Sequence, residues 1–342
     1  MKHKKIAIKK DGTILLGKKV SCDGFDVSRP IRVQSHVHDD HMNGFEQSKG
    51  YQKFIIMSKE CKDLLIQDKN ADIPYRNNII TLDYFKPMKI NNYKIIIAPS
   101  DHMLGSIQTK VIFRNGYSIV YSSDFDWPIT QGALKCDELV LDATSDNPET
   151  SWSKEQIIEQ LITRVHEKIK EKPIVIQGYR GRLQYAMQLI GSYFPDIPLI
   201  SSLRPYKYAK VYRNYGYDIK ELLLYTNNEA INLFKSHKSY IAFFELSESN
   251  RIPKGNVYKI YLSTHSSEEP ILDYSENHCR VALTDHADFI GTIEYIKATK
   301  CEKVITDPSR GGNAQDLAYH IKNMLGIEAY SASLVTSKEW GN

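Results

Sequence analysis

The 342-residue sequence is poor in cysteine and has no long hydrophobic run. None of its five cysteines forms a CxxC pair, so the sequence predicts neither a disulfide framework nor a cysteine-rich zinc module. No segment approaches the ~20 apolar residues of a membrane span. The apolar run Ile6–Ile8, which follows a basic N-terminus, is too short for the core of a signal peptide. We therefore expect a cytoplasmic protein with reduced thiols and no membrane partner.

The type of predicted secondary structure changes along the chain. Residues 1–145 alternate short β-type runs with turn signals, and helices alternate with strands after Ser153, which is expected to cap a helix. The predicted helices after that point cover residues 153–170, 182–193, 204–215, 289–298 and 314–325, and the predicted strands cover 173–177, 198–201, 280–283 and 303–306. This alternation predicts an α/β fold in which residues 155–265 form a domain inserted into a host domain of residues 1–154 and 266–342.

The predicted insert differs from the rest of the chain in charge and aromatic content. It holds 16 of the 45 Lys and Arg residues, 10 of the 41 Asp and Glu residues and 12 of the 22 tyrosines. Its net charge is therefore +6, although that of the whole chain is +4. Positive charge interleaved with aromatic rings suits a single-stranded polyanion with stackable bases. Solvated helix faces with tyrosines at a domain rim would give the same composition, so composition alone favours neither interpretation.

The densest group of ligand-type side chains is the segment Ser35–His41, SHVHDDH. Burying these imidazoles and carboxylates without a cation would be costly. Because side chains alternate along a strand, His36 and His38 project the same way, and Asp40 and His41 follow where they can face a second metal. Two metals roughly 3.5–4 Å apart can share a hydroxide and clamp both oxygens of an in-line phosphoryl displacement.

Further ligand-type residues follow later β-type runs. His102 comes after the apolar run 94–98, and Asp124 comes after the run 118–121, where it can bridge two metals. Upstream, Asp23 can orient a histidine ligand. The sequence therefore predicts a metal site that holds one or two ions.

Three further segments extend the pattern, and their residues resemble a known family. They are Ala98–Gln108 (APSDHMLGSIQ), Gly178–Gln184 (GYRGRLQ) and Thr284–Phe289 (TDHADF). Together with Ser35–His41 they resemble the β-CASP nuclease branch of the metallo-β-lactamase superfamily, from about residue 23 to residue 329. This resemblance implies a four-layer αββα metallo-β-lactamase fold with an inserted α/β β-CASP domain. In size and insert position the chain looks most like DNA-ligase-associated exonucleases and proteins similar to mRNA 3′-end processing nucleases.

The resemblance also implies a role for each candidate site residue. The ligands of one zinc ion would be His36, His38 and His102, and those of a second would be Asp40, His41 and a bridging Asp124. His286 would lie near the scissile phosphate, where it either protonates the leaving oxygen or stabilises the developing charge. Asp142 would pair with His286 and fix its orientation. Asp40, Asp142 and His286 are therefore the predicted catalytic residues.

One segment departs from the family pattern. RNA-processing members carry a further histidine after the strand that follows the TDHADF-like motif, whereas Lys303–Pro308 contains none. DNA crosslink-repair members, which are similar in fold, also lack this histidine. Either Asp307 substitutes as an oxygen ligand, or the second metal is weak or absent. This departure slightly favours DNA over RNA as the substrate but does not decide between them.

The predicted function is that of a zinc-dependent nuclease that hydrolyses single-stranded DNA or RNA, expected to act from an end. Arg180, Arg182 and Arg204 are the predicted phosphate contacts, and Arg182 stands at a helix start, where backbone N–H groups also favour an anion. One alternative is a small-molecule hydrolase of the same fold, which would not need the Arg- and Tyr-rich insert. Another is a non-catalytic nucleic-acid-binding subunit, which should have lost metal ligands. The oligomeric state stays open, and a homo-oligomer is compatible with the sequence.

Overall fold

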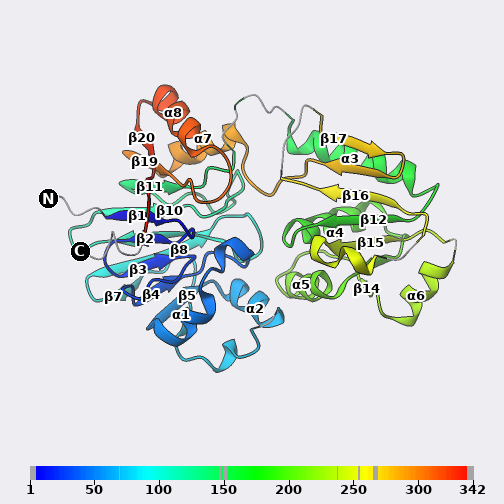
Figure 1. Cartoon of the computed structure of the whole chain (residues 1–342), viewed down its shortest axis with the longest axis horizontal. Coiled ribbons are helices and arrows are strands. Elements are labelled where there is room, and N and C mark those ends of the chain that lie inside the picture. The colour runs from blue at the N-terminus through cyan, green and yellow to red at the C-terminus, as the bar shows by residue number, and fades with distance from the viewer. Residues whose placement is uncertain are drawn as a thin grey trace. The chain divides into compact units, whose positions relative to one another are not determined.

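The computed structural model describes residues 5–68, 70–145, 148, 152–236, 238–252, 255–264 and 269–336. Within these residues the protein is a mixed α/β structure with three seven-stranded sheets (Figure 1). The chain divides into two compact units. The first unit comprises Met1–Pro148 and His286–Asn342, and the second unit comprises Glu149–Asp285. Among the described residues, no helix has the length and apolar character that crossing a membrane requires.

The first sheet of the first unit has the strand order β21-β1-β2-β3-β4-β5-β6. Its strands are β1 (Ile6–Lys9), β2 (Ile14–Leu16), β3 (Val20–Cys22), β4 (Ile31–Val33), β5 (Phe54–Met57), β6 (Ile79–Thr81) and β21 (Leu334–Val335). Strands β3 to β6 run parallel to one another. The carboxyl ends of these four strands therefore meet at one edge of the sheet.

The second sheet of the first unit has the strand order β20-β19-β11-β10-β9-β8-β7. Its strands are β7 (Met88–Ile90), β8 (Tyr93–Pro99), β9 (Ile107–Ile112), β10 (Ser118–Tyr121), β11 (Glu138–Leu141), β19 (Lys303–Thr306) and β20 (Glu328–Ser331). Strands β10, β11, β19 and β20 are parallel. Because β8 and β10 are each antiparallel to β9, these two strands also point the same way.

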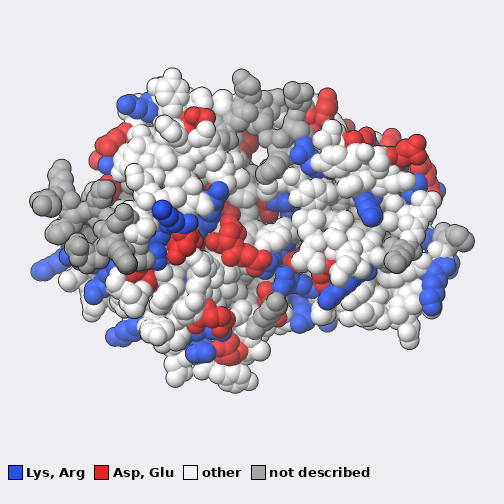
Figure 2. Space-filling model, viewed as in Figure 1, with Lys and Arg blue, Asp and Glu red and all other residues white. Residues whose placement is uncertain are grey.

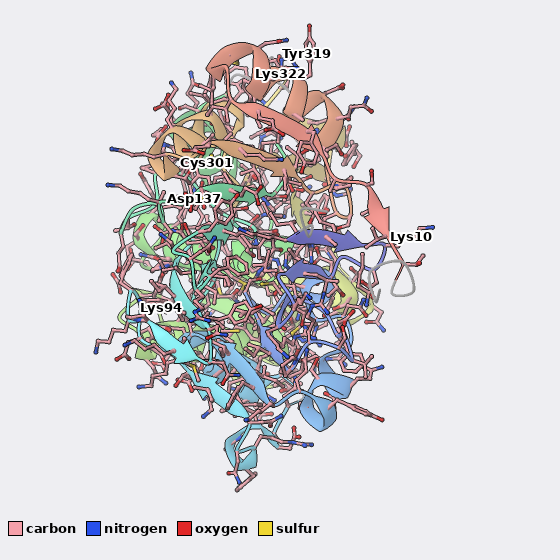
Figure 3. The ribbon with its side chains drawn as sticks, turned by 90° about the vertical axis from the view of Figure 1, so that its left-hand side faces the viewer. Lys10, Lys94, Asp137, Cys301, Tyr319 and Lys322 are labelled. Carbon is pink, nitrogen blue, oxygen red and sulfur yellow. The ribbon has the colours of Figure 1, made fainter. Side chains whose placement is uncertain are left out.

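The two sheets of the first unit share one apolar core, to which the first contributes Ile8 and Val33 and the second contributes Ile97 and Ile119. The other face of the second sheet packs on α7 (Phe289–Thr299) and α8 (Ala314–Leu325). Figure 3 shows Tyr319 and Lys322 of α8 pointing outward, whereas its other side buries Leu317 and Ile321. This 3.6-residue pattern is that of a helix with one face on a sheet.

The outer face of the first sheet is covered by α1 (Phe45–Tyr51), and α2 (Lys59–Gln67) follows β5. Arg32, at the centre of β4, alternates with two core residues and so points to this outer face. Its guanidinium donates to Ser48 Oγ of α1 at 3.0 Å and to the carbonyl oxygen of Asn43 at 2.8 Å. These bonds satisfy a fully buried arginine and fix α1 on the sheet.

The second unit is built on a sheet of order β14-β13-β15-β12-β16-β18-β17, in which only β17 is antiparallel to its neighbour among the described residues. Its strands are β12 (Ile174–Gly178), β13 (Leu199–Ser201), β14 (Leu223–Leu224), β15 (Ile241–Glu245), β16 (Tyr258–Leu262), β17 (Ile271–Ser275) and β18 (His278–Val281). Its helices are α3 (Lys154–Lys168), α4 (Arg182–Tyr193), α5 (Leu203–Asn214) and α6 (Asn228–Lys235). The helices and strands predicted after Ser153 are confirmed, with ends that differ by at most two residues.

The C-terminal limit of the second unit differs from the predicted boundary. The sequence placed that boundary between residues 265 and 266, which lie outside the described residues, whereas the second unit continues to Asp285. The physical reason is strand pairing, because β18 pairs in parallel with β16 and thereby belongs to the sheet of the second unit. The predicted helix cap is present, since Ser153 Oγ accepts from the backbone N–H of Gln156 and forms a capping box.

Candidate metal centre

The candidate metal ligands lie in loops that follow the carboxyl ends of strands of the first unit. Asp23 follows β3, the segment Ser35–His41 follows β4, His102 follows β8, and Asp124 follows β10. Parallel strands bring their carboxyl ends to one edge of a sheet, and the two sheets pack face to face. Residues far apart in the sequence therefore meet in one group, which is buried except for Asp39 and Asp40.

The first group of donor atoms comes from His36, His38, His102 and Asp124, whose ligand atoms all lie within 4.8 Å of one another. His38 Nδ1 lies 3.1 Å from His102 Nε2, and Asp124 Oδ2 lies 3.7 Å from both His36 Nε2 and His102 Nε2. In a tetrahedral zinc site with bonds of about 2.0–2.1 Å, neighbouring donor atoms are roughly 3.3 Å apart. These separations therefore suit a metal ion, with small adjustments of the side chains.

The burial of an unsatisfied nitrogen atom independently favours a cation. His36 Nε2 is buried and has no hydrogen-bond partner. Leaving such an atom unsatisfied costs about 1–3 kcal/mol, which a coordinate bond would offset. Burial, together with the nearby His41 and His38, lowers the pKa of His36 well below its ordinary value, so that its imidazole is neutral and able to bind a metal. The buried His/Asp group can therefore hold a metal ion.

A second group of donors adjoins the first through Asp124. His41 Nε2 lies 3.1 Å from Asp124 Oδ1 and 3.4 Å from Asp40 Oδ2. The two oxygens of Asp124 thus face different histidines, with Oδ2 towards His36 and Oδ1 towards His41. Burial alone would raise the pKa of Asp124, but His41 holds it well below its usual range, so this side chain is a carboxylate. Such a carboxylate can bridge two cations.

Asp23 fixes the orientation of His41. Its Oδ2 lies 2.8 Å from His41 Nδ1, and it also accepts from Ser35 Oγ at 2.6 Å and Tyr121 Oη at 3.0 Å. Burial and Arg310 oppose protonation of His41, but Asp124 and Asp23 raise the pKa of this imidazole well above its ordinary value. Metal binding at His41 should therefore release a proton.

His286 and Asp142 form a pair next to the first group. His286 Nδ1 lies 3.2 Å from Asp142 Oδ2, and its Nε2 lies 3.9 Å from Asp124 Oδ2. The other oxygen of Asp142 accepts from the backbone N–H of Thr144 at 3.1 Å and from its Oγ1 at 2.8 Å. The carboxylate is thus anchored on one side and turns Nε2 of the histidine towards the candidate metal ligands.

Asp307, the predicted substitute ligand, has other partners. Its Oδ1 accepts from the backbone N–H of Ser309 at 2.8 Å, and its Oδ2 accepts from Arg310 Nη1 at 2.7 Å. The carboxylate therefore holds Arg310, whose Nε lies 3.9 Å from Asp40 Oδ2. Sequence reasoning missed Arg310. The sequence carries no local signal for this contact, because Arg310 lies in the loop after β19, far from Asp40 along the chain.

Two of the three predicted phosphate contacts are buried in ion pairs of the second unit. Arg182 Nη2 lies 2.5 Å from Asp285 Oδ1, and Arg180 Nε lies 3.5 Å from Glu245 Oε1. Arg204 shares Glu245, at 3.0 Å from Oε2, but its side chain is 24% exposed, compared with 1% for Arg180. An anion would therefore reach Arg204 more readily than the other two, whose carboxylate partners the sequence did not reveal.

The basic surface of the second unit follows α5. Figure 2 shows Lys and Arg side chains over α5 and α6, and acidic side chains over β17 and α3. A small cavity of about 110 Å³ beside α5 is lined by residues that include Tyr206, Lys210, Arg213 and Glu221. Lys210 Nζ lies 4.7 Å from the centre of the Tyr206 ring. This helix therefore offers positive charge together with an aromatic ring.

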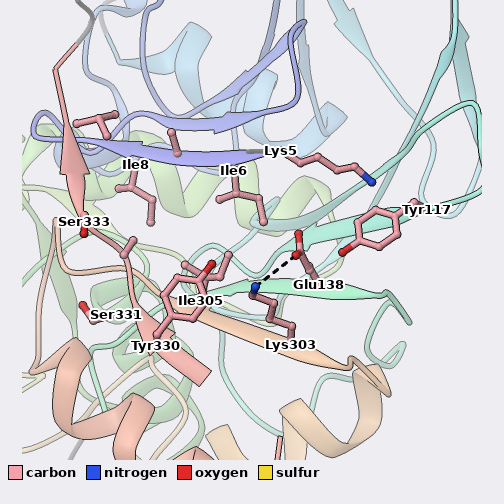
Figure 4. Close-up of a pocket in the computed structure, with 13 residues that line it drawn as sticks. Lys5, Ile6, Ile8, Tyr117, Glu138, Lys303, Ile305, Tyr330, Ser331 and Ser333 are labelled. Atoms are coloured by element: carbon pink, nitrogen blue, oxygen red, sulfur yellow. Dashed lines mark ion pairs between the residues drawn. The ribbon is translucent and has the colours of Figure 1, made fainter. Parts of the chain in front are cut away.

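A larger cavity of the first unit contains none of the candidate site residues. It has a volume of about 720 Å³ and opens where β1 and β21 of the first sheet face β19 and β20 of the second (Figure 4). Ile6, Ile8 and Ile305 form part of its wall, and Lys303 pairs with Glu138 at its rim. The candidate metal centre is therefore marked by its converging donor atoms and not by a large cavity.

Metal removal is expected to lower the melting temperature of the protein. A metal that binds only the folded state, at a free concentration of about 1,000 times its Kd, adds roughly 4 kcal/mol to the free energy of unfolding. For a unit of this size, this corresponds to a rise in melting temperature of about 8 °C or more. Calorimetry of chelator-treated protein, before and after addition of Zn²⁺, measures this shift. The His36→Ala variant should lose it, and an equal melting temperature with and without metal in the natural protein would contradict a metal centre.

Fold and site together define a mixed α/β protein with a buried His/Asp group that can hold a metal ion. No family model matches the chain. "Uncharacterized protein in lig 3'region" from Acidianus ambivalens is 29% identical over 112 residues, which span 32% of this chain and 79% of that protein. The crystal structure of a protein of unknown function from Enterococcus faecalis V583 has a TM-score of 0.57 and 14% identity, and the match covers 90% of this chain and 79% of that one. At this identity the likeness concerns the fold alone.

Proposed function

We propose that this protein is a zinc-dependent nuclease of the metallo-β-lactamase superfamily, in its β-CASP branch, which hydrolyses phosphodiester bonds in single-stranded DNA or RNA. The observation that carries the proposal is the position of Asp124, whose Oδ2 faces His36 and His102 and whose Oδ1 faces His41. A carboxylate between two sets of imidazoles suits one or two zinc ions. His286 adds a polar group on the same side.

The fold supports this proposal. Two sheets that share a core, with helices on their outer faces, are what a four-layer αββα metallo-β-lactamase fold requires. The α/β unit of residues 149–285 interrupts the first unit in the sequence, as an inserted β-CASP domain would. The relative from Acidianus ambivalens is named for the 3′ region of lig, which agrees with a role linked to DNA ligation.

The donor set fits zinc, since imidazole nitrogen and carboxylate oxygen are its usual ligands besides thiolate. A bound zinc ion would polarise the phosphate and supply a hydroxide nucleophile at neutral pH. His36, His38 and His102 would hold this ion, with Asp124. Asp142 accepts from His286 Nδ1 and would stabilise the imidazolium form of this histidine, in which Nε2 also carries a proton that it can donate to a phosphate oxygen that gains charge.

The substrate proposal rests on the second unit. Arg204 is partly exposed, and α5 continues with Lys207, Lys210 and Arg213 beside Tyr206. Basic groups bind a phosphate backbone, and exposed rings stack on unpaired bases. These contacts do not distinguish deoxyribose from ribose, so both nucleic acids are included in the test.

The test is the degradation of matched single-stranded DNA and RNA, each labelled at either end, by zinc-loaded protein. Product ladders should fall by more than about 100-fold in Asp40→Asn, because this change removes a charged donor 3.4 Å from His41 Nε2. Asp39→Asn is the matched control, since it makes the same chemical change at the exposed neighbouring residue and should retain activity. If neither strand is cut, while thioester or lactam substrates are hydrolysed, the protein is a small-molecule hydrolase instead.

A further inference from the structure

A buried arginine lies beside the second group of donors. The side chain of Arg310 is only 8% exposed, and its Nη2 donates to the carbonyl oxygen of Gly12 at 2.8 Å. Its Nη1 donates to Asp307 Oδ2 at 2.7 Å. The Nε atom is buried without a hydrogen-bond partner and lies 3.9 Å from Asp40 Oδ2. The guanidinium is thus held on two sides, and its third side faces a candidate metal ligand.

The loop that carries Arg310 is fixed by close packing. Gly312 has a φ of +73°, and a Cβ atom at this position would lie 1.7 Å from the carbonyl oxygen of Ala143. Only glycine allows the loop after β19 to approach the loop after β11 so closely. Because the backbone and both terminal nitrogens are held, Arg310 cannot readily withdraw from Asp40. An arginine also stays charged under all ordinary conditions.

This fixed charge acts on the second donor group. A divalent ion bound to Asp40 Oδ2 at about 2 Å would lie no more than about 6 Å from Arg310 Nε. At this separation, like charges in a partly buried site repel appreciably. The guanidinium also supplies positive charge to Asp40 without a metal. The two effects together disfavour a second ion and leave the first group, His36, His38 and His102 with Asp124, as the stronger site.

We propose that Arg310 is a positioning residue that restricts tight metal binding to one ion per chain, at the first group, and takes the place of the second ion beside Asp40. The inference rests on the metal centre of the proposed function and adds its stoichiometry. It also gives Asp307 a role, since the carboxylate that sequence reasoning treated as a substitute ligand holds the arginine in position.

The test is a measurement of bound Zn²⁺ per chain by elemental analysis after dialysis against buffered free zinc. The natural protein should hold one ion over a wide range of free zinc, and a second should bind at least tenfold more weakly. Arg310→Gln should tighten the second ion by at least tenfold, whereas Arg310→Lys, which keeps the charge, should resemble the natural protein. Co²⁺ loading gives an independent readout, because magnetic coupling between paired ions should appear at lower Co²⁺ in Arg310→Gln.

Each outcome bears on a separate statement. Two ions of similar affinity in the natural protein overturn the role of Arg310, and this result needs no variant. A folded Arg310→Gln protein whose affinity for the second ion is unchanged also overturns this role. If Arg310→Gln does not fold, Arg310→Met is measured in its place. If the natural protein binds no zinc at all, the metal centre itself is wrong, and the proposed function fails with it.

Discussion

Replacing Asp124 with alanine is expected to lower the rate of phosphodiester cleavage by at least about 1,000-fold and to reduce bound zinc below one ion per chain. Asp124 Oδ2 lies 3.7 Å from His36 Nε2 and from His102 Nε2, and Oδ1 lies 3.1 Å from His41 Nε2. The substitution removes the negative charge that these imidazoles share. Asp124 is a proposed ligand of the zinc ion that would supply the nucleophile, and a loss of about 4 kcal/mol of transition-state stabilisation corresponds to roughly 1,000-fold in rate.

The measurements are single-turnover cleavage and zinc content of the same protein samples. Asp126→Ala is the matched control, because Asp126 lies in the same loop and accepts from the backbone N–H of Trp127. This variant should keep its zinc and its activity to within about tenfold. An Asp124→Ala protein that retains both zinc and activity would show that Asp124 does not join the two donor groups.

The positions of the first-unit ligands were open to prediction because local patterns and strand direction determine them. The alternating residues of Ser35–His41 follow β4, and His102 and Asp124 follow two strands that point the same way. The glycine in APSDHMLGSIQ also has a local reason. Gly105 has a φ of +77°, and a Cβ atom there would lie 2.5 Å from the backbone nitrogen of Cys61, so a larger residue would not fit.

Ion-pair partners far apart in the sequence were not open to prediction. Arg182 pairs with Asp285, and Arg180 and Arg204 share Glu245, because strands of the second unit bring their ends together. Composition gives the number of positive charges but not which of them a buried carboxylate neutralises. An arginine in a basic segment therefore looked like a phosphate contact even where it is a structural ion pair.

The role of Arg310 and the C-terminal limit of the second unit could not be predicted from the sequence, for the same reason. No local signal connects Arg310 with Asp40, because their approach depends on how the loops after β19 and β4 meet. Likewise, β18 can be assigned to the second unit only once its pairing with β16 is known. Local structure was predictable in both cases, and the missing information was the set of contacts between distant segments.

Replacing His286 with alanine is expected to lower the cleavage rate by about 100- to 1,000-fold while leaving bound zinc unchanged. His286 Nε2 lies 3.9 Å from Asp124 Oδ2, and the proposed function has it donate to the phosphate rather than bind the metal. A positioned acid or charge-stabilising donor contributes about 100- to 10,000-fold. Unchanged zinc with a reduced rate therefore separates this role from that of a ligand, whereas loss of zinc would make His286 part of the metal centre.

Asp142 should act only through His286, so the effects of Asp142→Asn and His286→Ala on the cleavage rate should not be additive. Asp142→Asn keeps the shape of the side chain but weakens its hold on His286 Nδ1, 3.2 Å away, and should cost about 10- to 100-fold. The double variant should then be no slower than His286→Ala alone, because the carboxylate has no histidine left to orient. If the rate losses of the two single variants multiply in the double variant, Asp142 contributes independently, for example by holding the loop through its bonds to Thr144. The double-variant cycle therefore decides whether the pair works as one unit.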